Sequence, residues 1–350
     1  MKNFKRVIII IMSFIINFIL IDGTSNSINA NTRVSPGQPA KVAIISFKTE
    51  ASYLSLVRKN LERIQSENSD KVEFTFFDSK DDERVQNEII DNLLQSQTDL
   101  FVINLVNTSK NSIVAVIDKI KEKNVPVILL NIAPSEIDSV KSYSKAVVIS
   151  TNEEQSGTLQ GQIIVKAWNS NKEIIDKNKD NILEYVMLTG YPNNYATIAR
   201  TKYSILAIND AGIKTQEIAL RVANFDRELA RNTMDSLFLS QGDRIEAVIA
   251  NNDDMAIGAI ESLQKYGYNK GNKSMTIPVV GIGATPQAQE LIKKGFMTGT
   301  VAENPVIQAE VTYKIGMNLI YNKPPTDGTE YKVDETGITI NIPYKEYIFD

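Results

Sequence analysis

The segment from Asp176 to Glu184 carries oxygen-bearing side chains at the spacing that binds a hard cation. Such side chains stand at positions 1, 3, 5 and 9, and position 7 can contribute its backbone carbonyl. Position 6 of such a loop needs a left-handed turn, which asparagine adopts best after glycine. The residues at these positions are Asp176, Asn178, Asp180, Asn181, Ile182 and Glu184. The spacing predicts a structural Ca²⁺ loop, and a solvated loop rich in Asp, Asn and Lys is the alternative.

Side chains that usually perform catalysis are scarce. The 350 residues include no cysteine and no histidine. The chain therefore has no disulfide, no thiolate metal site, no cysteine nucleophile and no lipid-attachment cysteine, and it lacks the commonest general base. A glycine-rich phosphate loop and a Gly-x-Ser-x-Gly elbow are also missing. These absences predict that the protein is not an enzyme. A hydrolase would instead need paired carboxylates facing a cleft.

The charge and the length of the chain further restrict which class of protein it can be. The 38 basic and 42 acidic residues leave a formal net charge of −4, so no basic excess is present to hold a phosphate backbone. We expect no nucleic-acid partner. A chain of 350 residues is too long for one ordinary core and predicts two lobes of typical size.

The N-terminus has the pattern of an export signal. Lys2, Lys5 and Arg6 precede an apolar run from Val7 to Ile21, and a stretch of small polar residues follows. The run is shorter than the roughly 20 residues that span a bilayer comfortably. We therefore predict that residues 1–30 are a signal peptide or an uncleaved membrane anchor, and that residues 31–40 are a linker. Either form places the remaining protein outside the cytoplasm.

Short apolar runs alternate with amphipathic segments along the rest of the chain. This alternation predicts repeated strand–helix–strand units and an α/β fold with two doubly wound parallel-sheet lobes. Ligands of such sheets lie beyond the carboxyl ends of the strands. The predicted strands are Val42–Phe47, Val72–Phe77, Leu100–Asn104, Val127–Leu130, Ala146–Ile149, Leu183–Leu188, Ala247–Ala250, Ile277–Gly281 and Gly299–Val301.

Ordered stretches over most of the chain resemble the periplasmic galactose/glucose-binding proteins of bacteria. The stretches include LFVINLVNTS, NVPVILLN, TNEEQSGTLQGQIIVKAW, LTGYPNNYATIARTKY, IEAVIANNDDMAIGAIESL and GTVAENPVIQA. The resemblance implies a monomeric binding protein whose two lobes, joined by a three-stranded hinge, close around a sugar. In that family an ABC permease or a chemoreceptor reads the closed form, and the missing lipid-attachment cysteine of this chain suits a membrane sensor such as a histidine kinase. It also implies that Glu246 completes the Ca²⁺ loop.

The resemblance also divides the chain between the lobes. Residues 41–149 and 305–337 would form the N-terminal lobe, and residues 150–304 and 338–350 would form the C-terminal lobe with the Ca²⁺ loop 176–184. Related repressors carry a DNA-binding segment where this chain has its export signal. The resemblance therefore implies an extracellular, cell-surface or periplasmic protein that is not a repressor.

Several positions match ligand contacts of that family, and several depart from them. The matching positions, implied by the resemblance, are Phe47, Tyr53, Asn104, Arg200, Phe225 and Asn252. Three ligand-binding aspartates of the family are replaced by Ala51, Ala196 and Gly283, its histidine by Asn194, and one of its asparagines by Glu303. Because bonds to a charged acceptor are about twice as strong as neutral ones, the departures weaken the expectation of glucose or galactose.

Two alternatives follow from the departures. Without an acid at Ala196, Arg200 would lack a neighbouring counter-charge, and an anionic ligand could then supply one. The chain could instead be a degenerate relative that binds only a protein partner, with its asparagines capping helices and its aromatic residues in the core. We predict a sugar-like ligand, with these two alternatives open.

Overall fold

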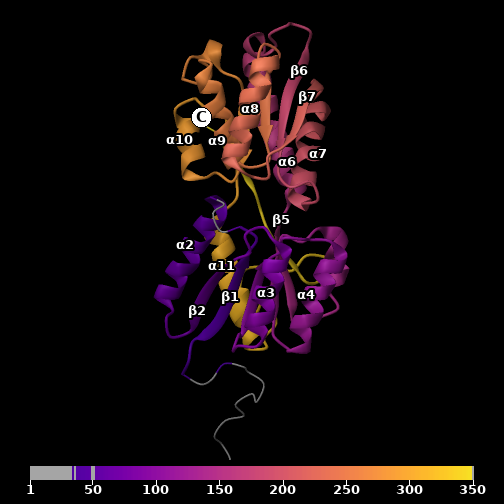
Figure 1. The fold of residues 1–350 in the computed structure, drawn as a ribbon, viewed down its shortest axis with the longest axis vertical. Coiled ribbons are helices and arrows are strands. Elements are labelled where there is room, and N and C mark those ends of the chain that lie inside the picture. The colour runs from indigo at the N-terminus through magenta and orange to yellow at the C-terminus, as the bar shows by residue number, and fades with distance from the viewer. Residues whose placement is uncertain (1–33, 35–36, 49–51, 349–350) are drawn as a thin grey trace, which may run out of the picture.

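The computed structural model describes residue 34, residues 37–48 and residues 52–348. The predicted export segment, part of the predicted linker and Ala51 lie outside the described residues. Two lobes lie one above the other (Figure 1), and each is built on a six-stranded sheet. The predicted α/β fold with two parallel-sheet lobes is confirmed. Within the described part of the chain, no helix is both long enough and apolar enough to cross a bilayer.

The first lobe is a wholly parallel sheet with strand order β11-β5-β4-β3-β1-β2. Its strands are β1 (Ala40–Ser46), β2 (Val72–Asp78), β3 (Leu100–Asn104), β4 (Val127–Leu130), β5 (Ala146–Thr151) and β11 (Thr339–Ile342). Its helices are α2 (Ser52–Glu67), α3 (Glu83–Leu94), α4 (Lys110–Glu122), α5 (Ile137–Val140), α11 (Pro305–Ile320) and the 3₁₀ turn η2 (Pro134–Glu136).

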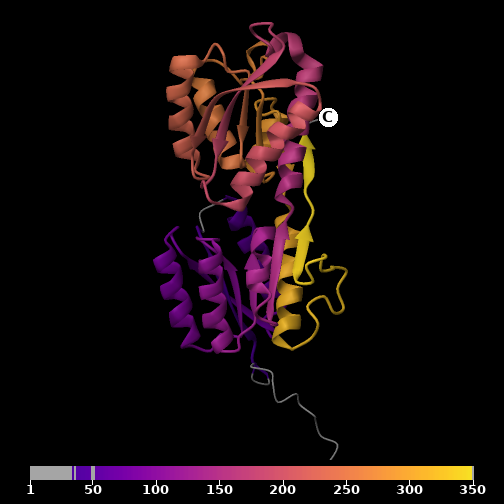
Figure 2. The ribbon, with the colours of Figure 1, turned by 90° about the vertical axis from the view of Figure 1, so that its right-hand side faces the viewer.

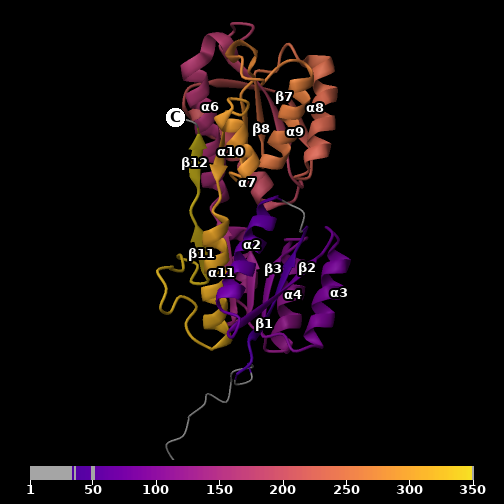
Figure 3. The same ribbon diagram turned by 90° about the vertical axis from the view of Figure 1, so that its left-hand side faces the viewer.

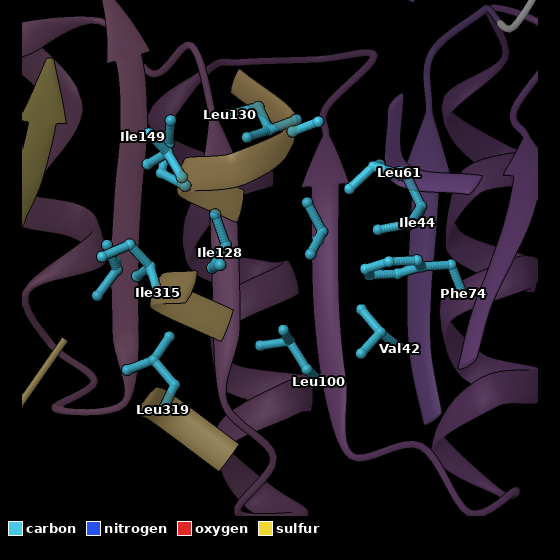
Figure 4. Packing of buried hydrophobic residues seen from close by; sticks show 14 of the residues in the cluster. Val42, Ile44, Leu61, Phe74, Leu100, Ile128, Leu130, Ile149, Ile315 and Leu319 are labelled. Carbon is cyan, nitrogen blue, oxygen red and sulfur yellow. The ribbon is translucent and has the colours of Figure 1, made fainter. Parts of the chain in front are cut away.

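Apolar side chains on both faces of this sheet are buried, as expected when helices cover a parallel sheet on both sides. Helices α2 and α11 pack on one face, where Leu61 and Ile315 join Val42, Leu100 and other strand residues in one cluster (Figure 4). Helices α3, α4 and α5 cover the opposite face.

The second lobe repeats the arrangement with strand order β12-β10-β9-β8-β6-β7. Its strands are β6 (Ile182–Thr189), β7 (Lys214–Val222), β8 (Ala247–Ala250), β9 (Val279–Ile282), β10 (Gly299–Ala302) and β12 (Lys345–Ile348). Only β12 runs antiparallel to its neighbour. The helices are α6 (Glu153–Ile175), α7 (Tyr195–Asp210), α8 (Arg227–Gln241), α9 (Asp253–Lys265), α10 (Pro286–Lys293) and η3 (Lys273–Met275).

The chain crosses between the lobes after β5, after β10 and between β11 and β12 (Figures 2 and 3). The last boundary between the lobes is predicted just before residue 338, but in the structure the third crossing lies later in the chain. Strand β11 pairs in parallel with β5, from Thr339 opposite Val148 to Ile342 opposite Thr151. It therefore belongs to the first lobe, because it covers the backbone edge that β5 would otherwise leave unpaired. The third crossing follows Ile342.

Candidate functional site

A cavity of about 760 Å³ lies between the lobes, at the carboxyl ends of strands from both sheets. Phe47 and the loop after β3, with Asn107 and Ser109, line it from the first lobe. The second lobe contributes the loop after β6, with Tyr191 and Asn194, and Tyr195 at the start of α7. Aromatic rings beside amide and hydroxyl groups suit a polar solute, since rings cover C–H faces and the polar groups fix orientation.

The ring of Tyr191 contacts two aromatic residues that were predicted to contact the ligand, one in each lobe. Its ring meets Phe47 of the first lobe at 6.4 Å, edge to face, and Phe225 of the second lobe at 5.9 Å. Phe225 has a left-handed backbone (φ 58°), and its ring lies over Gly190, where a Cβ atom would be 2.1 Å from the ring. Tyr191 lies within the GYPNNY stretch, and no sequence pattern marks it as a ligand contact.

Two polar contacts also bridge the lobes at the edge of the cleft. Ser52 at the start of α2 donates its hydroxyl to Asp254 Oδ1 at 2.7 Å and its backbone N–H to Oδ2 at 3.3 Å. The ammonium group of Lys48 lies 3.4 Å from the carboxylate of Asp226. With the aromatic contacts, these bonds bring the lobes together around the cavity.

Arg200 is buried beside the hinge, where its three nitrogen atoms each have a partner. Nε donates to Glu153 Oε2 at 2.7 Å, Nη1 to the carbonyl of Asn251 at 2.9 Å, and Nη2 to the hydroxyl of Tyr344 at 2.9 Å. Glu153 also accepts bonds from Thr151 at 2.6 Å and from Tyr344 at 3.1 Å. Arg200, Glu153 and Tyr344 are 7%, 1% and 3% exposed.

This arrangement corrects the expectation that Arg200 lacks a counter-charge. Ala196 supplies none, but Glu153 at the start of α6 does. Burial alone would lower the pKa of Arg200, but the neighbouring Glu153, Tyr344 and Glu303 raise it above its ordinary value. The predicted free cation that an anionic ligand could neutralise is therefore absent at this position.

Glu303 is a second acid beside the same arginine. Its Oε2 lies 4.0 Å from Arg200 Nη2, and the hydroxyl of Tyr53 faces its carboxyl group. Tyr53 also donates a hydrogen bond to Gln308 Oε1 at 2.6 Å. Burial raises the pKa of Glu303 to about 8, although Arg200 acts in the opposite direction. The structure thus brings together three residues predicted at the ligand site: Tyr53, Arg200 and Glu303.

Two of the three asparagines of the predicted site have structural partners for their side chains. Asn194 and Asn252 are the N-caps of α7 and α9, accepting from the backbone of Thr197 at 3.2 Å and of Met255 at 3.0 Å. Asn252 also donates to the carbonyl of Phe225 at 3.2 Å. Asn104 ends β3 and is half-buried. Capping uses one oxygen of each amide, so the helix-cap interpretation and a ligand contact are compatible.

Gly283, which replaces one of the family's aspartates, lies where a side chain would be strained in this structure. Its φ of 136° is a conformation that L side chains rarely adopt, and a Cβ atom there would lie 3.2 Å from Asp253 Oδ2. Asp253 is buried and accepts bonds from Thr300 at 2.5 Å and from the backbone of Thr285 at 2.7 Å. Burial raises the pKa of Asp253 to about 6. A second acid at position 283 would add like charge to a crowded buried site.

The predicted cation loop folds as a chain of carboxylate-to-backbone bonds. Asp176 accepts from the N–H groups of Asp180 and Asn181, each at 3.1 Å, and Asp180 accepts from Ile182 at 2.8 Å. Asn181 adopts the predicted left-handed turn, with φ 64°. Glu246 is buried and accepts from the backbone N–H groups of Lys177 at 2.7 Å and Glu184 at 2.9 Å.

The loop holds the donors that Ca²⁺ prefers, but one of them is engaged elsewhere. Asn178 lies 3.1 Å from Asp180 and 3.4 Å from Glu184, so these oxygen-bearing side chains share one region. Arg244 binds Glu184, with Nε 3.1 Å from Oε1. In the part of the chain that the structure describes, no three Asp, Glu, His or Cys side chains stand in a group that could hold a metal ion. The loop supplies oxygen donors of the kind that Ca²⁺ takes, but in this arrangement they do not form a metal-binding group, and Glu184 is paired with Arg244.

Comparison with known proteins finds similarity over most of the chain. Residues 42–324 match the family model described as a periplasmic binding protein domain. The D-galactose/methyl-galactoside binding periplasmic protein MglB of Haemophilus influenzae is 30% identical over 305 residues, covering 87% of this chain and 88% of that protein. The ribose import binding protein RbsB of Bacillus subtilis is 23% identical over 279 residues, covering 80% and 81%.

Solved structures share the same fold at lower identity. An ABC transporter solute-binding protein of Bacillus halodurans with bound myo-inositol aligns with a TM-score of 0.71 and 22% identity, covering 90% of this chain and 96% of that one. One from Actinobacillus succinogenes with bound D-allose aligns with a TM-score of 0.72 and 16% identity, covering 88% and 97%.

Proposed function

Because the chain belongs to the periplasmic binding protein domain family, we propose that it is an exported, non-enzymatic solute-binding protein that encloses a monosaccharide or a related polyol between its lobes. The observation that carries the proposal is the cavity of about 760 Å³ at the carboxyl ends of strands from both sheets. The three chain crossings allow the lobes to rotate about a common hinge. The closed form would deliver the solute to an ABC permease or signal to a membrane sensor.

A matching sugar should stabilise the purified protein against thermal unfolding. A ligand at 100 times its dissociation constant adds about 2.7 kcal/mol to the free energy of unfolding. We would screen pentoses, hexoses, deoxy sugars and inositols, then repeat the best ligand with Tyr191→Ala, which removes the ring between Phe47 and Phe225. Tyr321→Ala, at the exposed end of α11, is the control. If no compound shifts the unfolding midpoint, a role through a protein partner replaces solute binding.

We also propose that the loop 176–184 binds a structural Ca²⁺. The support is the shared region of Asp176, Asn178, Asp180 and Glu184, with the buried Glu246 bonded to the loop backbone. The side-chain oxygens and the carbonyl of Ile182 would hold the ion, which would tie this loop to the start of β8.

Calcium should raise the unfolding midpoint of EDTA-treated protein, and Mg²⁺ should do so less. Asp180→Asn should weaken Ca²⁺ binding about tenfold, because it removes one ligand charge. Arg244→Met should strengthen it, because Glu184 is then free to turn to the ion. Asp210→Asn, at the exposed end of α7, is the control. Isothermal titration calorimetry gives the affinities, and equal affinities in all four proteins would contradict the site.

A further inference from the structure

The start of helix α2 lacks the side chain that usually caps a helix. The first N–H groups of a helix have no partner within it, and an Asp, Asn, Ser or Thr just before the helix usually accepts from one of them. Asp82 does so for α3 and Asp226 for α8. The residue before α2 is Ala51, which has no side-chain acceptor, and the first turn of α2 contains no acid. A cap for α2 therefore has to come from outside its own segment or from water.

Asp254 of the opposite lobe supplies this cap. Its carboxylate accepts the backbone N–H of Ser52, the first residue of α2, at 3.3 Å and the hydroxyl of Ser52 at 2.7 Å. Asp254 also lies in the first turn of α9, where the helix dipole favours a negative charge. One carboxylate thus lies at the positive ends of two helices, one from each lobe. It can do so only while the lobes are together.

The other polar contact at this edge of the cleft is weaker. Lys48 and Asp226 form an ion pair at 3.4 Å, and their side chains are 32% and 39% exposed, so water and salt screen the attraction. Asp226 is already engaged as the N-cap of α8. Both bonds to Asp254 are part-buried and have a charged acceptor, which makes such bonds about twice as strong as neutral ones. Of the two contacts, the one made by Asp254 therefore contributes more to closure.

The capped start of α2 adjoins the cleft without facing the large cavity. Neither Ser52 nor Asp254 belongs to the described lining of the cavity of about 760 Å³. Both line a smaller cavity of about 260 Å³ between the lobes, and Phe47 lines the two cavities together. Tyr53, next along α2, is bonded to Gln308 on α11. The cap thus acts on the position of a lobe and a helix, and not on the solute itself.

We propose that Asp254 is a positioning residue for solute binding, because it caps α2 across the cleft and so stabilises the closed form whatever the solute. Losing a helix cap changes an equilibrium constant by roughly fivefold, and here the equilibrium lies between open and closed lobes. Every solute that binds the closed form should lose affinity by the same factor, and by no more than this. The effect on affinity rests on the proposed solute-binding function, whereas the cap between the lobes does not.

Fluorescent labels on the two lobes measure the open and closed populations directly. The chain has no cysteine, so Glu88→Cys on α3 and Ser236→Cys on α8, both exposed, give one dye site on each lobe. In single-molecule energy transfer, Asp254→Ala should raise the ratio of open to closed molecules about fivefold. Asp254→Asn should restore most of the closed form, because asparagine caps a helix nearly as well as aspartate. An unchanged ratio in Asp254→Ala overturns the inference.

Two further variants separate the contact between the lobes from the stability of a helix. Ser52→Ala removes the hydroxyl donor and should also open the lobes. Combined with Asp254→Ala, it should open them no further, since both changes act on one contact. Asp82→Ala removes the cap of α3 within a single lobe, so it should lower the unfolding midpoint and leave the ratio unchanged. Equal opening in Asp82→Ala would assign the effect to lost helix stability and overturn the inference.

Calorimetric titration tests the consequence for binding, with glucose, ribose and myo-inositol as the first probes. Asp254→Ala should weaken the binding of each sugar by the same factor, whereas Tyr191→Ala, inside the large cavity, should weaken them unequally. Unequal losses in Asp254→Ala would make Asp254 a ligand contact and overturn its positioning role. Failure of every screened sugar to bind the unaltered protein overturns the proposed function, and the ratio of open to closed molecules still decides whether Asp254 holds the lobes together.

Discussion

Replacing Arg200 by methionine should lower the free energy of unfolding by about 3–5 kcal/mol, because it strands a buried acid without its partner. Glu153 is 1% exposed and would keep only hydroxyl donors from Thr151, Ser156 and Tyr344. Glu303 would lose the same arginine. A loss of this size is exceptional for one substitution and is diagnostic of a buried charge network.

Chemical denaturation of matched variants tests this prediction. The double variant Arg200→Met with Glu153→Gln should recover much of the loss, since the uncompensated charge is gone. Arg63→Met removes an exposed ion pair with Glu67 on α2 and should cost less than about 1 kcal/mol. If Arg200→Met and Arg63→Met cost the same, the buried cluster does not stabilise the fold.

The position of this cluster gives it a role in lobe movement. Each chain crossing contributes a member: Glu153 follows β5, Glu303 follows β10, and Tyr344 lies between β11 and β12. Arg200, from α7 of the second lobe, bonds to two of them and approaches the third. When the lobes rotate, they must therefore rotate about three crossings that the side chain of Arg200 links. Arg200 therefore links the hinge crossings, and the ligand contact expected of it from the family resemblance stays a prediction.

Much of the fold could be predicted from local pattern. Central strands such as β4 and β8 are buried at every residue, and their unbroken apolar runs are visible in the sequence. The edge strands β7 and β12 were not predicted as strands, because they mix exposed charged residues with few buried apolar ones. Strand β11 is short and was assigned to the other lobe, since its pairing with β5 joins segments far apart in sequence.

The site was only partly predictable for a related reason. Tyr53, Arg200 and Glu303 were found by position in the family resemblance, and the structure places them together. Glu153 and Tyr344 were missed. An acid in the first turn of a helix, such as Glu153, usually indicates a favourable helix start, and nothing local reveals that it meets α7. Their role depends on long-range packing, which no single-sequence pattern encodes.

Replacing Glu303 by glutamine should stabilise the protein increasingly as the pH rises. The folded-state pKa of Glu303 is about 8, above its ordinary 4.5, so the folded protein binds more protons than the unfolded chain between these values. The stability contributed by this group is complete below about pH 4.5 and is lost as the pH rises toward 8. At 1.36 kcal/mol for each pKa unit, the loss amounts to a few kcal/mol.

Urea denaturation of both proteins from pH 5 to pH 9 measures this effect. The difference in unfolding free energy between Glu303→Gln and the unaltered protein should be small at pH 5, grow through neutral pH and level off above pH 8. Asp253, whose pKa is raised to about 6 and whose charge acts on Glu303, titrates in both proteins, so most of its effect cancels in the difference. Glu88→Gln should run parallel to the unaltered protein, because that side chain is exposed. A Glu303→Gln curve that is also parallel would mean that Glu303 is ionised throughout, with Arg200 compensating its charge fully.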